Sequence, residues 1–273
     1  MESARTSGRI PSTGRDFPDL RVESGEIGGA RWCVSTRYTG GSAGEFAEAN
    51  VAQHVGDDPR AVAANRRGLL AALSTSRDAA YIQAEHGAQV AWVDSSGEVA
   101  NVDALITETP GLGIVALGAD CAVVGLTGHR VDGTVVAAVV HCGWRGLAVD
   151  VIGSALDCLA AQSVQELTAV VGPAICGRCY QVSRERCADI ESNCSSEVAN
   201  AAITRSDSDT GAVIWGIDIA AGVRARLQQR GVKTIGDFGC TFEQDRWFSL
   251  RRSVERGGPQ ARTGRHALAM VVK

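Results

Sequence analysis

The chain lacks an excess of basic residues and any long hydrophobic run. Its 27 lysines and arginines are outnumbered by 31 aspartates and glutamates, which gives a formal net charge of −4. A broad nucleic-acid-binding surface needs a basic excess, so we expect no nucleic-acid partner. No apolar run approaches the roughly 20 residues that a membrane helix requires, so we expect no membrane partner either.

The beginning of the chain lacks the apolar segment of a signal peptide. Residues 1–25 are rich in serine, glycine and arginine, and we predict that they form a flexible N-terminal tail. The arginines are also typical of a transit peptide, but Glu2, Asp16 and Asp19 argue against one. The nine cysteines are an odd number, which favours a reducing compartment over a disulfide framework. We therefore expect a cytoplasmic protein.

From residue 26 onward, strand-like and helix-like stretches alternate. Asp57-Asp58-Pro59 predicts the start of a helix that ends near Leu73, because aspartate caps a helix and proline suits its first turn. Further helices are expected after Gly146 and over 217–229, and a polar loop over 195–211. The predicted strands lie at 28–35, 79–84, 89–93, 103–107, 113–117, 121–126, 135–140, 167–171, 233–237 and 267–272. This pattern predicts one α/β domain over 26–273, with mixed β-sheets layered between outer helices.

Three short motifs, each after a predicted strand, carry the side chains with the most chemistry. They are His86-Gly87, Asp120-Cys121 and His141-Cys142-Gly143-Trp144-Arg145-Gly146. Two imidazoles and a thiolate are good zinc ligands, and three protein ligands leave the fourth tetrahedral position open for chemistry. The spacing is too long for a local metal motif, however, and a lone histidine or cysteine in a strand is usually structural. The residues alone leave both interpretations open.

Four further cysteines suggest a second metal site only weakly. Cys176 and Cys179 form a CxxC pair, and zinc ribbons use two such pairs. Cys187 and Cys194 are separated by six residues and form no second CxxC. The surrounding pattern is not that of a thioredoxin-like fold, so a redox pair is not favoured either. We do not expect a second zinc site from this spacing.

Longer motifs along the chain resemble one known family. They are GDDPRAVAANR (56–66), EHG (85–87), VDALIT (102–107), ADC (119–121), HCGWRG (141–146), VGPAICGRCYQV (171–182), GIDI (216–219), CT (240–241), FSLRR (248–252) and RTGRHA (262–267). Residues 26–273 resemble the laccase-domain family, also called multicopper polyphenol oxidase-like proteins. Cys142 stands where the family usually has alanine, and Leu250 where it usually has tyrosine.

The resemblance implies a zinc-dependent purine nucleoside phosphorylase. It implies that His86, Cys121 and His141 are the zinc ligands and the catalytic centre. Zinc in such a site lowers the pKa of a bound water toward about 7, which also suits deamination at C6 of adenine. Copper is a possible replacement for zinc. Copper-dependent phenol oxidation is not expected, because the chain has only five histidines and its two methionines are Met1 and Met270.

Phosphorolysis adds a need for phosphate beside C1′ of the ribose. Arginine suits this role because its planar fork matches the phosphate oxygens. Arg37, Arg145 and Arg265 lie in glycine-flanked or family-matching stretches, and we expect one or two of them to bind phosphate. Asp120 is expected to orient a ligand histidine. Asn50 and His54 lie in a stretch that resembles the family's region near the pocket, with His54 expected to pack or cap rather than bind metal.

The expected substrates are adenosine, inosine and 5′-methylthioadenosine with phosphate, and adenosine deaminase activity is expected as well. Two alternatives stay open. Cys121 and His141 also suit a cysteine hydrolase, in which the histidine is the base. Some bacterial relatives are described as peptidoglycan editing factors, which act on wall precursors. The sequence does not set the oligomeric state.

Overall fold

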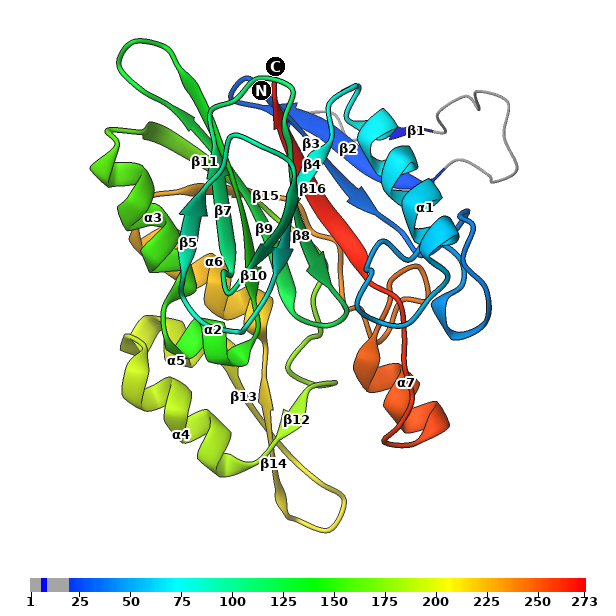
Figure 1. Ribbon diagram of the computed structural model, residues 1–273. Coiled ribbons are helices and arrows are strands. Elements are labelled where there is room, and N and C mark those ends of the chain that lie inside the picture. Colours follow the sequence, from blue (N-terminus) through cyan, green and yellow to red (C-terminus); the bar gives the residue numbers. More distant parts are fainter. Residues whose placement is uncertain (1–5, 9–19) are drawn as a thin grey trace.

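A computed structural model describes residues 6–8 and 20–273 of the protein. Two large β-sheets pack face to face, and helices cover their outer faces (Figure 1). A third, small sheet lies at one end of the molecule, at the bottom of Figure 1. This arrangement confirms the predicted α/β fold of mixed sheets between outer helices. Within the described ranges, no helix is long and apolar enough to cross a membrane.

The first large sheet has seven strands. Only the β4–β8 and β4–β6 pairs are parallel, and the other neighbours are antiparallel. In spatial order the strands are β1 (Thr6–Gly8), β2 (Val22–Ile27), β3 (Ala30–Ser35), β16 (His266–Val272), β8 (Gly113–Gly118), β4 (Ala79–Gln83) and β6 (Gly97–Ala100).

The second large sheet has six strands and is also mixed. Its parallel pairs lie at the two edges, β11–β15 and β5–β7. In spatial order the strands are β15 (Lys233–Ile235), β11 (Gln165–Val171), β9 (Ala122–His129), β10 (Val135–Cys142), β7 (Ala104–Thr107) and β5 (Val90–Trp92).

The remaining elements are the small sheet and the helices. The small antiparallel sheet has the order β12 (Gln181–Val182), β14 (Val213–Ile217) and β13 (Ile203–Asp207). The helices are the 3₁₀ turn η1 (Gly44–Phe46), α1 (Pro59–Ala72), α2 (Trp144–Ala148), α3 (Val151–Ala161), α4 (Arg184–Asn193), α5 (Ser196–Ala202), α6 (Ile219–Gln229) and α7 (Leu250–Gly257).

The two large sheets share a core that explains the continuous apolar runs in the sequence. Val34 and Leu268 from the first sheet join Val123, Val139 and Val170 from the second in one cluster, and all five are fully buried. Residues on the opposite faces of β9 and β10 are buried under helices. Strands buried on both faces read as continuous hydrophobic runs rather than as alternating patterns.

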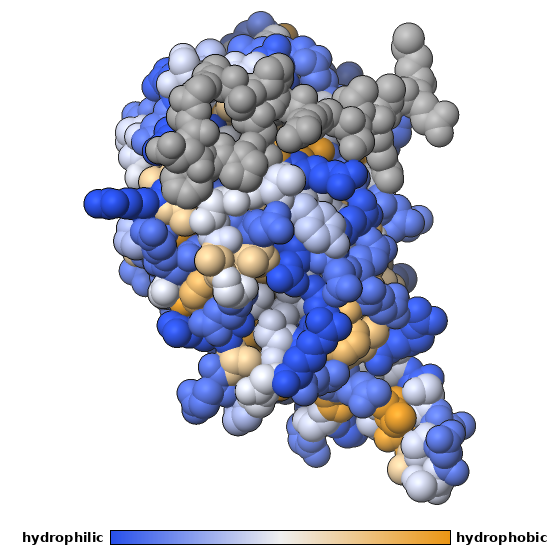
Figure 2. Space-filling view, turned by 90° about the vertical axis from the view of Figure 1, so that its right-hand side faces the viewer, coloured by the Kyte–Doolittle hydropathy of each residue, from blue (hydrophilic) through white to orange (hydrophobic). Residues whose placement is uncertain are grey.

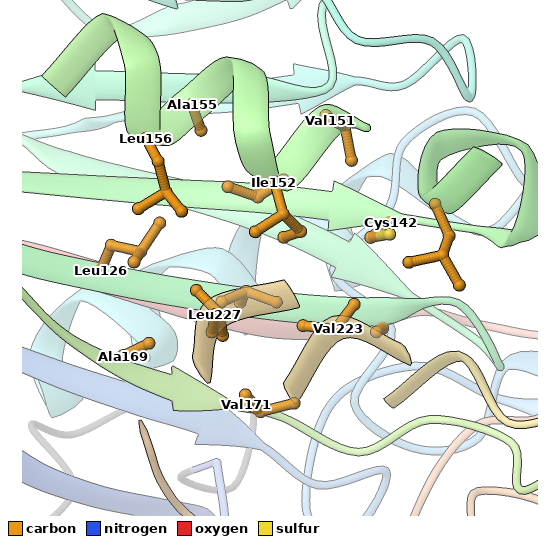
Figure 3. Close-up of a cluster of buried hydrophobic side chains, with 14 of the residues drawn as sticks. Leu126, Cys142, Val151, Ile152, Ala155, Leu156, Ala169, Val171, Val223 and Leu227 are labelled. Atoms are coloured by element: carbon orange, nitrogen blue, oxygen red, sulfur yellow. The ribbon is translucent and has the colours of Figure 1, made fainter. Parts of the chain in front are cut away.

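Helices α3 and α6 cover the outer face of the six-stranded sheet. Figure 3 shows Ile152 and Leu156 of α3 pointing toward the strands that carry Leu126 and Val171. Leu227 of α6 belongs to the same cluster. This packing supports β9 and β10 from one side while the other sheet supports them from the other. The two strands are therefore rigid supports for whatever side chains stand at their ends.

Helix α1 covers the outer face of the seven-stranded sheet, and its start confirms the predicted cap. The Asp58 side chain accepts a hydrogen bond from the backbone N–H of Arg60 at 2.9 Å, and Pro59 occupies the first turn. Leu69 and Leu73 are fully buried against this sheet. Figure 2 views the molecule from the side on which α1 and α7 lie; hydrophilic residues dominate it and hydrophobic ones are scattered.

The helix expected after Gly146 is broken in two. Asp150 between α2 and α3 has a φ of 58°, in the left-handed region, so the chain cannot continue as one helix there. Its side chain caps α3 by accepting from the N–H of Gly153 at 3.0 Å, and it pairs with Arg226 of α6 at 2.5 Å. Both contacts stabilise the break.

The polar loop expected over 195–211 was wrong. Ser195 caps α5, and Val198, Ala199 and Ala202 of that helix are buried. The chain then forms β13 and turns back into β14. A helix of seven residues with a short apolar face gives little periodic signal, which is why the polar composition misled the prediction.

The predicted tail extends too far. Residues 22–25 belong to β2, which pairs with β3 in register from Val22–Ser35 to Ile27–Ala30. Val22 is buried, so this part of the chain belongs to the domain. Residues 6–8 of the predicted tail form β1, which pairs with β2. Residues 1–5 and 9–19 of the predicted tail lie outside the described residues.

Candidate metal centre

Three side chains from separate parts of the fold converge at one end of the sheets. His86 follows β4, Cys121 directly precedes β9, and His141 lies near the end of β10. One potential ligand atom from each residue lies within 4.8 Å of the others, and Cys121 Sγ is 3.8 Å from His86 Nε2. The structure thus brings together the three residues singled out in the sequence. We call His86, Cys121 and His141 the histidine–cysteine cluster.

A buried carboxylate, Asp103, holds both histidines in place. Asp103 Oδ1 is 2.9 Å from Nδ1 of His141, and the side chains are 1% and 6% exposed. That contact occupies Nδ1 and leaves Nε2 of His141 to face the cluster. Asp103 also accepts from the backbone N–H groups of Glu85, His86 and Gly87, at 3.3, 3.0 and 2.7 Å. A carboxylate behind a ligand histidine is a common feature of metal sites.

Two local backbone features make room for the cluster. His86 adopts a φ of 59°, which is uncommon for a residue other than glycine and is held by the hydrogen bonds to Asp103. A Cβ at Gly143 would lie 2.8 Å from Cδ2 of His86 and 3.1 Å from Sγ of Cys121. The glycine after His141-Cys142 is therefore required by space rather than by backbone conformation.

The cluster stabilises a charged pair when no metal is bound. Burial alone would raise the pKa of the Cys121 thiol, but the His141 and His86 rings lower it to about 6. Burial would lower the pKa of His141, whereas the Cys121 thiolate and the Asp103 carboxylate raise it to about 9. A metal cation that binds here would replace the proton of the His141 imidazolium and would find Cys121 already in its thiolate form. Metal binding would release that proton.

Asp120 does not orient a ligand histidine, which corrects our expectation. Its Oδ1 accepts from the Thr241 hydroxyl at 2.6 Å, and its Oδ2 accepts from the backbone N–H of Arg251 at 2.7 Å. Asp120 has a φ of 101°, so the chain turns sharply just before Cys121. Its carboxylate ties that turn to the loop that carries Thr241 and to the first turn of α7. The residue with the expected role is Asp103.

Arg265 is the predicted phosphate-binding arginine whose pKa reflects the charge of Cys121 in the cluster. Burial lowers its pKa, while the charges of Cys121 and Asp120 oppose that effect. Its Nη1 donates to two carbonyls of its own loop, those of Thr263 and Gly264. These contacts hold the guanidinium in a half-buried position, where it feels the negative charge of the Cys121 thiolate.

Arg145 and Arg37 differ in how their donors are used. Arg145 is exposed at the start of α2, 5.5 Å from the Trp144 ring centroid, and no hydrogen bond of its guanidinium is found among residues 6–8 and 20–273. Arg37 donates from Nε and Nη2 to the Ala47 carbonyl at 3.1 and 2.9 Å and lies over the Phe248 ring. Arg37 therefore braces its own loop.

Asn50 and His54 both interact with Arg265. Asn50 is fully buried, and its Oδ1 accepts from the backbone N–H of Arg265 at 2.9 Å. It holds the backbone that carries this arginine. Burial and the positive charge of Arg265 lower the pKa of His54. His54 is not part of the histidine–cysteine cluster.

The CxxC pair has partners that the sequence analysis missed. Cys176 and Cys179 gather with Cys240 and Glu243, not with Cys187 and Cys194. Cys187 is buried in the hydrophobic cluster that also contains residues of α3 and α6, and the Cys194 thiol donates to the Leu147 carbonyl. The CT motif at 240–241 was the available signal for Cys240. Asp103 likewise stood in the quoted VDALIT motif, but nothing in the sequence linked it to residues 85–87.

A protein-family model supplies the wider comparison. The model described as multi-copper polyphenol oxidoreductase laccase matches residues 31–273. The chain belongs to this family. A purine nucleoside phosphorylase of Streptomyces coelicolor is 37% identical over 243 residues, covering 85% of this chain and 93% of the relative. One from Mycobacterium tuberculosis is 34% identical over 233 residues, covering 83% of this chain and 88% of the relative.

Solved structures share the fold of this laccase-family chain. YlmD from Geobacillus stearothermophilus has a TM-score of 0.76 at 23% identity, covering 97% of this chain and 99% of that chain. A YfiH protein from Bacillus licheniformis has a TM-score of 0.77 at 22% identity, covering 94% and 98%. The layered architecture is therefore shared with these two solved structures.

The family's name refers to copper, but within residues 6–8 and 20–273 the cluster has no neighbouring methionine of the kind found in a blue-copper site. Such sites add a weak axial methionine to two histidines and a cysteine. Met270 is fully buried in β16 and belongs to the core between the sheets. A Cβ on Gly125 would lie 2.6 Å from its sulfur, so Met270 packs closely against β9.

Proposed function

We propose that this protein is a zinc-dependent purine nucleoside phosphorylase whose centre is the histidine–cysteine cluster. The observation that carries the proposal is the convergence of His86, Cys121 and His141 around Asp103, which fixes one imidazole and the loop of the other. Relatives at 34% and 37% identity that are named purine nucleoside phosphorylase support the same reading.

The donor set fits zinc. Two imidazole nitrogens and one thiolate are ligands that zinc accepts, and Asp103 sets the tautomer of His141 so that Nε2 is available. When bound there, zinc supplies a Lewis-acidic position not filled by protein, which polarises an oxygen ligand or lowers the pKa of a water. A hard cation such as magnesium prefers oxygen ligands, so this set disfavours it.

Phosphorolysis forms a bond between a phosphate oxygen and C1′ of the ribose as the bond from C1′ to the purine breaks. We propose that Arg265 and Arg145 hold the phosphate. Arg265 is half-buried and interacts electrostatically with Cys121, and the guanidinium of Arg145 makes no hydrogen bond to the described residues. Arg37 ranks behind them, because its Nε and Nη2 both donate to Ala47.

We propose adenosine, inosine and 5′-methylthioadenosine as the nucleosides, with adenosine deamination as a second activity. The products of phosphorolysis are the free base and ribose 1-phosphate or its methylthio derivative. Deamination exchanges the 6-amino group of adenine for oxygen from water and releases ammonia, so it needs no phosphate. The two reactions therefore differ in whether they require phosphate, which an assay can include or leave out.

Product analysis tests this assignment. The purified protein is incubated with adenosine, with and without phosphate, and the products are identified by chromatography and mass spectrometry. Adenine and ribose 1-phosphate that appear only with phosphate support phosphorolysis, and inosine in both reactions supports deamination. If adenosine, inosine and 5′-methylthioadenosine all stay unchanged with phosphate and zinc present, the proposed function is wrong.

A cysteine hydrolase is the second candidate, because Cys121, His141 and Asp103 also form a nucleophile–base–carboxylate chain. The lowered pKa of Cys121 and the 2.9 Å contact between His141 and Asp103 favour it. His86 favours the metal, since a cysteine nucleophile needs only one base. Covalent trapping of Cys121 by an electrophilic substrate analogue during turnover without metal supports the hydrolase. Stoichiometric zinc that is required for turnover supports the phosphorylase.

A further inference from the structure

A second group of metal-ligand side chains lies apart from the histidine–cysteine cluster in the sequence. Cys176, Cys179, Cys240 and Glu243 each offer one atom, and these atoms all lie within 4.8 Å of one another. Oε1 of Glu243 is 3.8 Å from Sγ of Cys176 and 3.4 Å from Sγ of Cys179. We call these four residues the cysteine–glutamate cluster.

Backbone contacts between two distant loops build this cluster. Ala174 and Cys240 form an isolated parallel bridge, and the N–H of Thr241 donates to the Ala174 carbonyl at 3.1 Å. The N–H of Cys176 donates to Sγ of Cys240 at 3.3 Å. The chain turns at Cys176, whose carbonyl accepts from the N–H of Cys179 at 3.1 Å. The loops are therefore held together by the backbone before any ion is considered.

The spacing of the ligand atoms suits a tetrahedral ion. With zinc–sulfur bonds of about 2.3 Å and zinc–oxygen bonds of about 2.0 Å, sulfur and oxygen lie about 3.5 Å apart around the metal. The two sulfur–oxygen distances, 3.4 and 3.8 Å, bracket that value. Three sulfurs and one carboxylate also match the preference of zinc for thiolates.

We propose that Cys176, Cys179, Cys240 and Glu243 form a second, structural zinc site. Four protein ligands fill the tetrahedron, so this site is closed to substrate. Binding replaces up to three thiol protons, which are released to solvent, and no electron is transferred. Arg178, which pairs with Glu243 at 3.0 Å, offsets part of the negative charge of the ligands.

The proposed site would brace the turn that carries Cys121. Thr241 follows Cys240 and donates its hydroxyl to Asp120, while the N–H of Ile175 donates to the Asp120 carbonyl at 2.9 Å. Both loops of the cysteine–glutamate cluster thus contact the residue before Cys121. The structural ion would hold the two loops together without taking part in the reaction.

Zinc stoichiometry tests the proposal without relying on enzyme activity. The reduced, zinc-saturated protein is desalted, and zinc is measured by elemental analysis in variants whose folding is checked by circular dichroism. We expect two zinc ions in the wild type, one in Cys176→Ser and one in Cys121→Ser. The double variant should hold none. Cys158→Ser, at a half-buried cysteine outside both clusters, is the matched control and should keep two.

Cobalt titration of the wild type keeps the test valid if Cys176→Ser does not fold. Three thiolates around cobalt(II) give stronger thiolate-to-metal charge-transfer absorption than the single thiolate of Cys121. We expect two absorbing equivalents, one of them clearly stronger. A single, weakly absorbing equivalent, or zinc content unchanged in Cys176→Ser, overturns the proposal. A Cys176–Cys179 disulfide in protein purified without oxidant, with no zinc at these residues, overturns it as well. The phosphorylase proposal survives those results, because it rests on the other cluster.

Discussion

The histidine–cysteine and cysteine–glutamate clusters contain similar ligand atoms but are supported differently. His141 lies within β10, Cys121 directly before β9, and the carboxylate behind His141 is 1% exposed. The other cluster lies on two loops, and its Glu243 is exposed and pairs with Arg178, whose side chain is 82% exposed. The strands and a buried carboxylate hold the side chains of the histidine–cysteine cluster in place, whereas contacts between loops hold those of the cysteine–glutamate cluster.

The difference shows how the number of ligands, and the rigidity of the elements that carry them, bear on the role of a metal site. Three ligands at or beside the ends of rigid strands would leave one position open and hold it in a fixed place, which is what catalysis requires. Four ligands on loops would close the coordination shell and join segments far apart in the chain. The following predictions separate the two clusters, in order of expected effect.

Cys121→Ser should have the largest effect. It removes the only thiolate of the histidine–cysteine cluster, so zinc at this cluster and nucleoside phosphorolysis should both fall to background. The measurements are zinc content and ribose 1-phosphate formation. Cys142→Ala is the matched control. Cys142 directly follows His141 in the chain, but its side chain is buried in the hydrophobic cluster beneath α3 and α6. Cys142→Ala should keep both properties, and a loss there would contradict the assignment.

Asp103→Asn should weaken the histidine–cysteine cluster and leave the cysteine–glutamate cluster intact. The change removes the charge that faces Nδ1 of His141 and weakens the acceptor for three backbone N–H groups. Loss of such a partner typically costs about 10- to 100-fold in metal affinity. Competition with a chelator measures the affinity of each zinc. Equal weakening at both clusters would mean that the variant disturbs the fold rather than the site.

Gly143→Ala should affect the same cluster more mildly. The added methyl group would lie 2.8 Å from His86 Cδ2, so the imidazole must shift. We expect about a tenfold loss of zinc affinity, since displacing a positioned group by even about 1 Å is costly. Gly257→Ala in α7, where the new Cβ meets only the Ala261 side chain, is the control. Unchanged affinity in Gly143→Ala would show that the ring has room to move.

Replacement of the arginines should have the smallest effect and should rank them. Arg265→Gln is expected to raise the KM for phosphate by about tenfold, as expected for a lost charged hydrogen bond. Arg145→Gln should raise it less, and Arg37→Gln should leave it unchanged while lowering thermal stability. Steady-state kinetics at varied phosphate and thermal unfolding provide the values. A larger KM effect for Arg37 than for Arg265 would reverse our ranking.

The sequence predicted the layered α/β class because strands buried on both faces leave strong apolar runs, as in β9 and β10. It also singled out His86, Cys121 and His141, although their spacing alone did not join them. Family resemblance joined them, and the structure brings them within 4.8 Å. Short elements such as α5 were missed because seven residues with three buried side chains carry too little periodicity.

Partners that meet only through tertiary contacts were beyond the sequence patterns. Asp103 reaches the His86 loop across the fold, whereas Asp120 looked suitable because it neighbours Cys121 in the chain. Cys240 meets Cys176 across 64 residues through loop-to-loop contacts. Cys187 and Cys194 were the nearer choice in sequence, but α4 and its following turn carry them elsewhere. Adjacency in the chain was a poor guide in both cases.

Removal and return of metal tests the central claim most directly. The protein is stripped with a chelator, zinc is returned stepwise, and ribose 1-phosphate formed from adenosine and phosphate is measured beside zinc content. We predict that the stripped wild type is inactive, that activity returns as the histidine–cysteine cluster fills, and that Cys121→Ser stays inactive at any zinc level. Full phosphorolysis by metal-free Cys121→Ser protein would contradict the account.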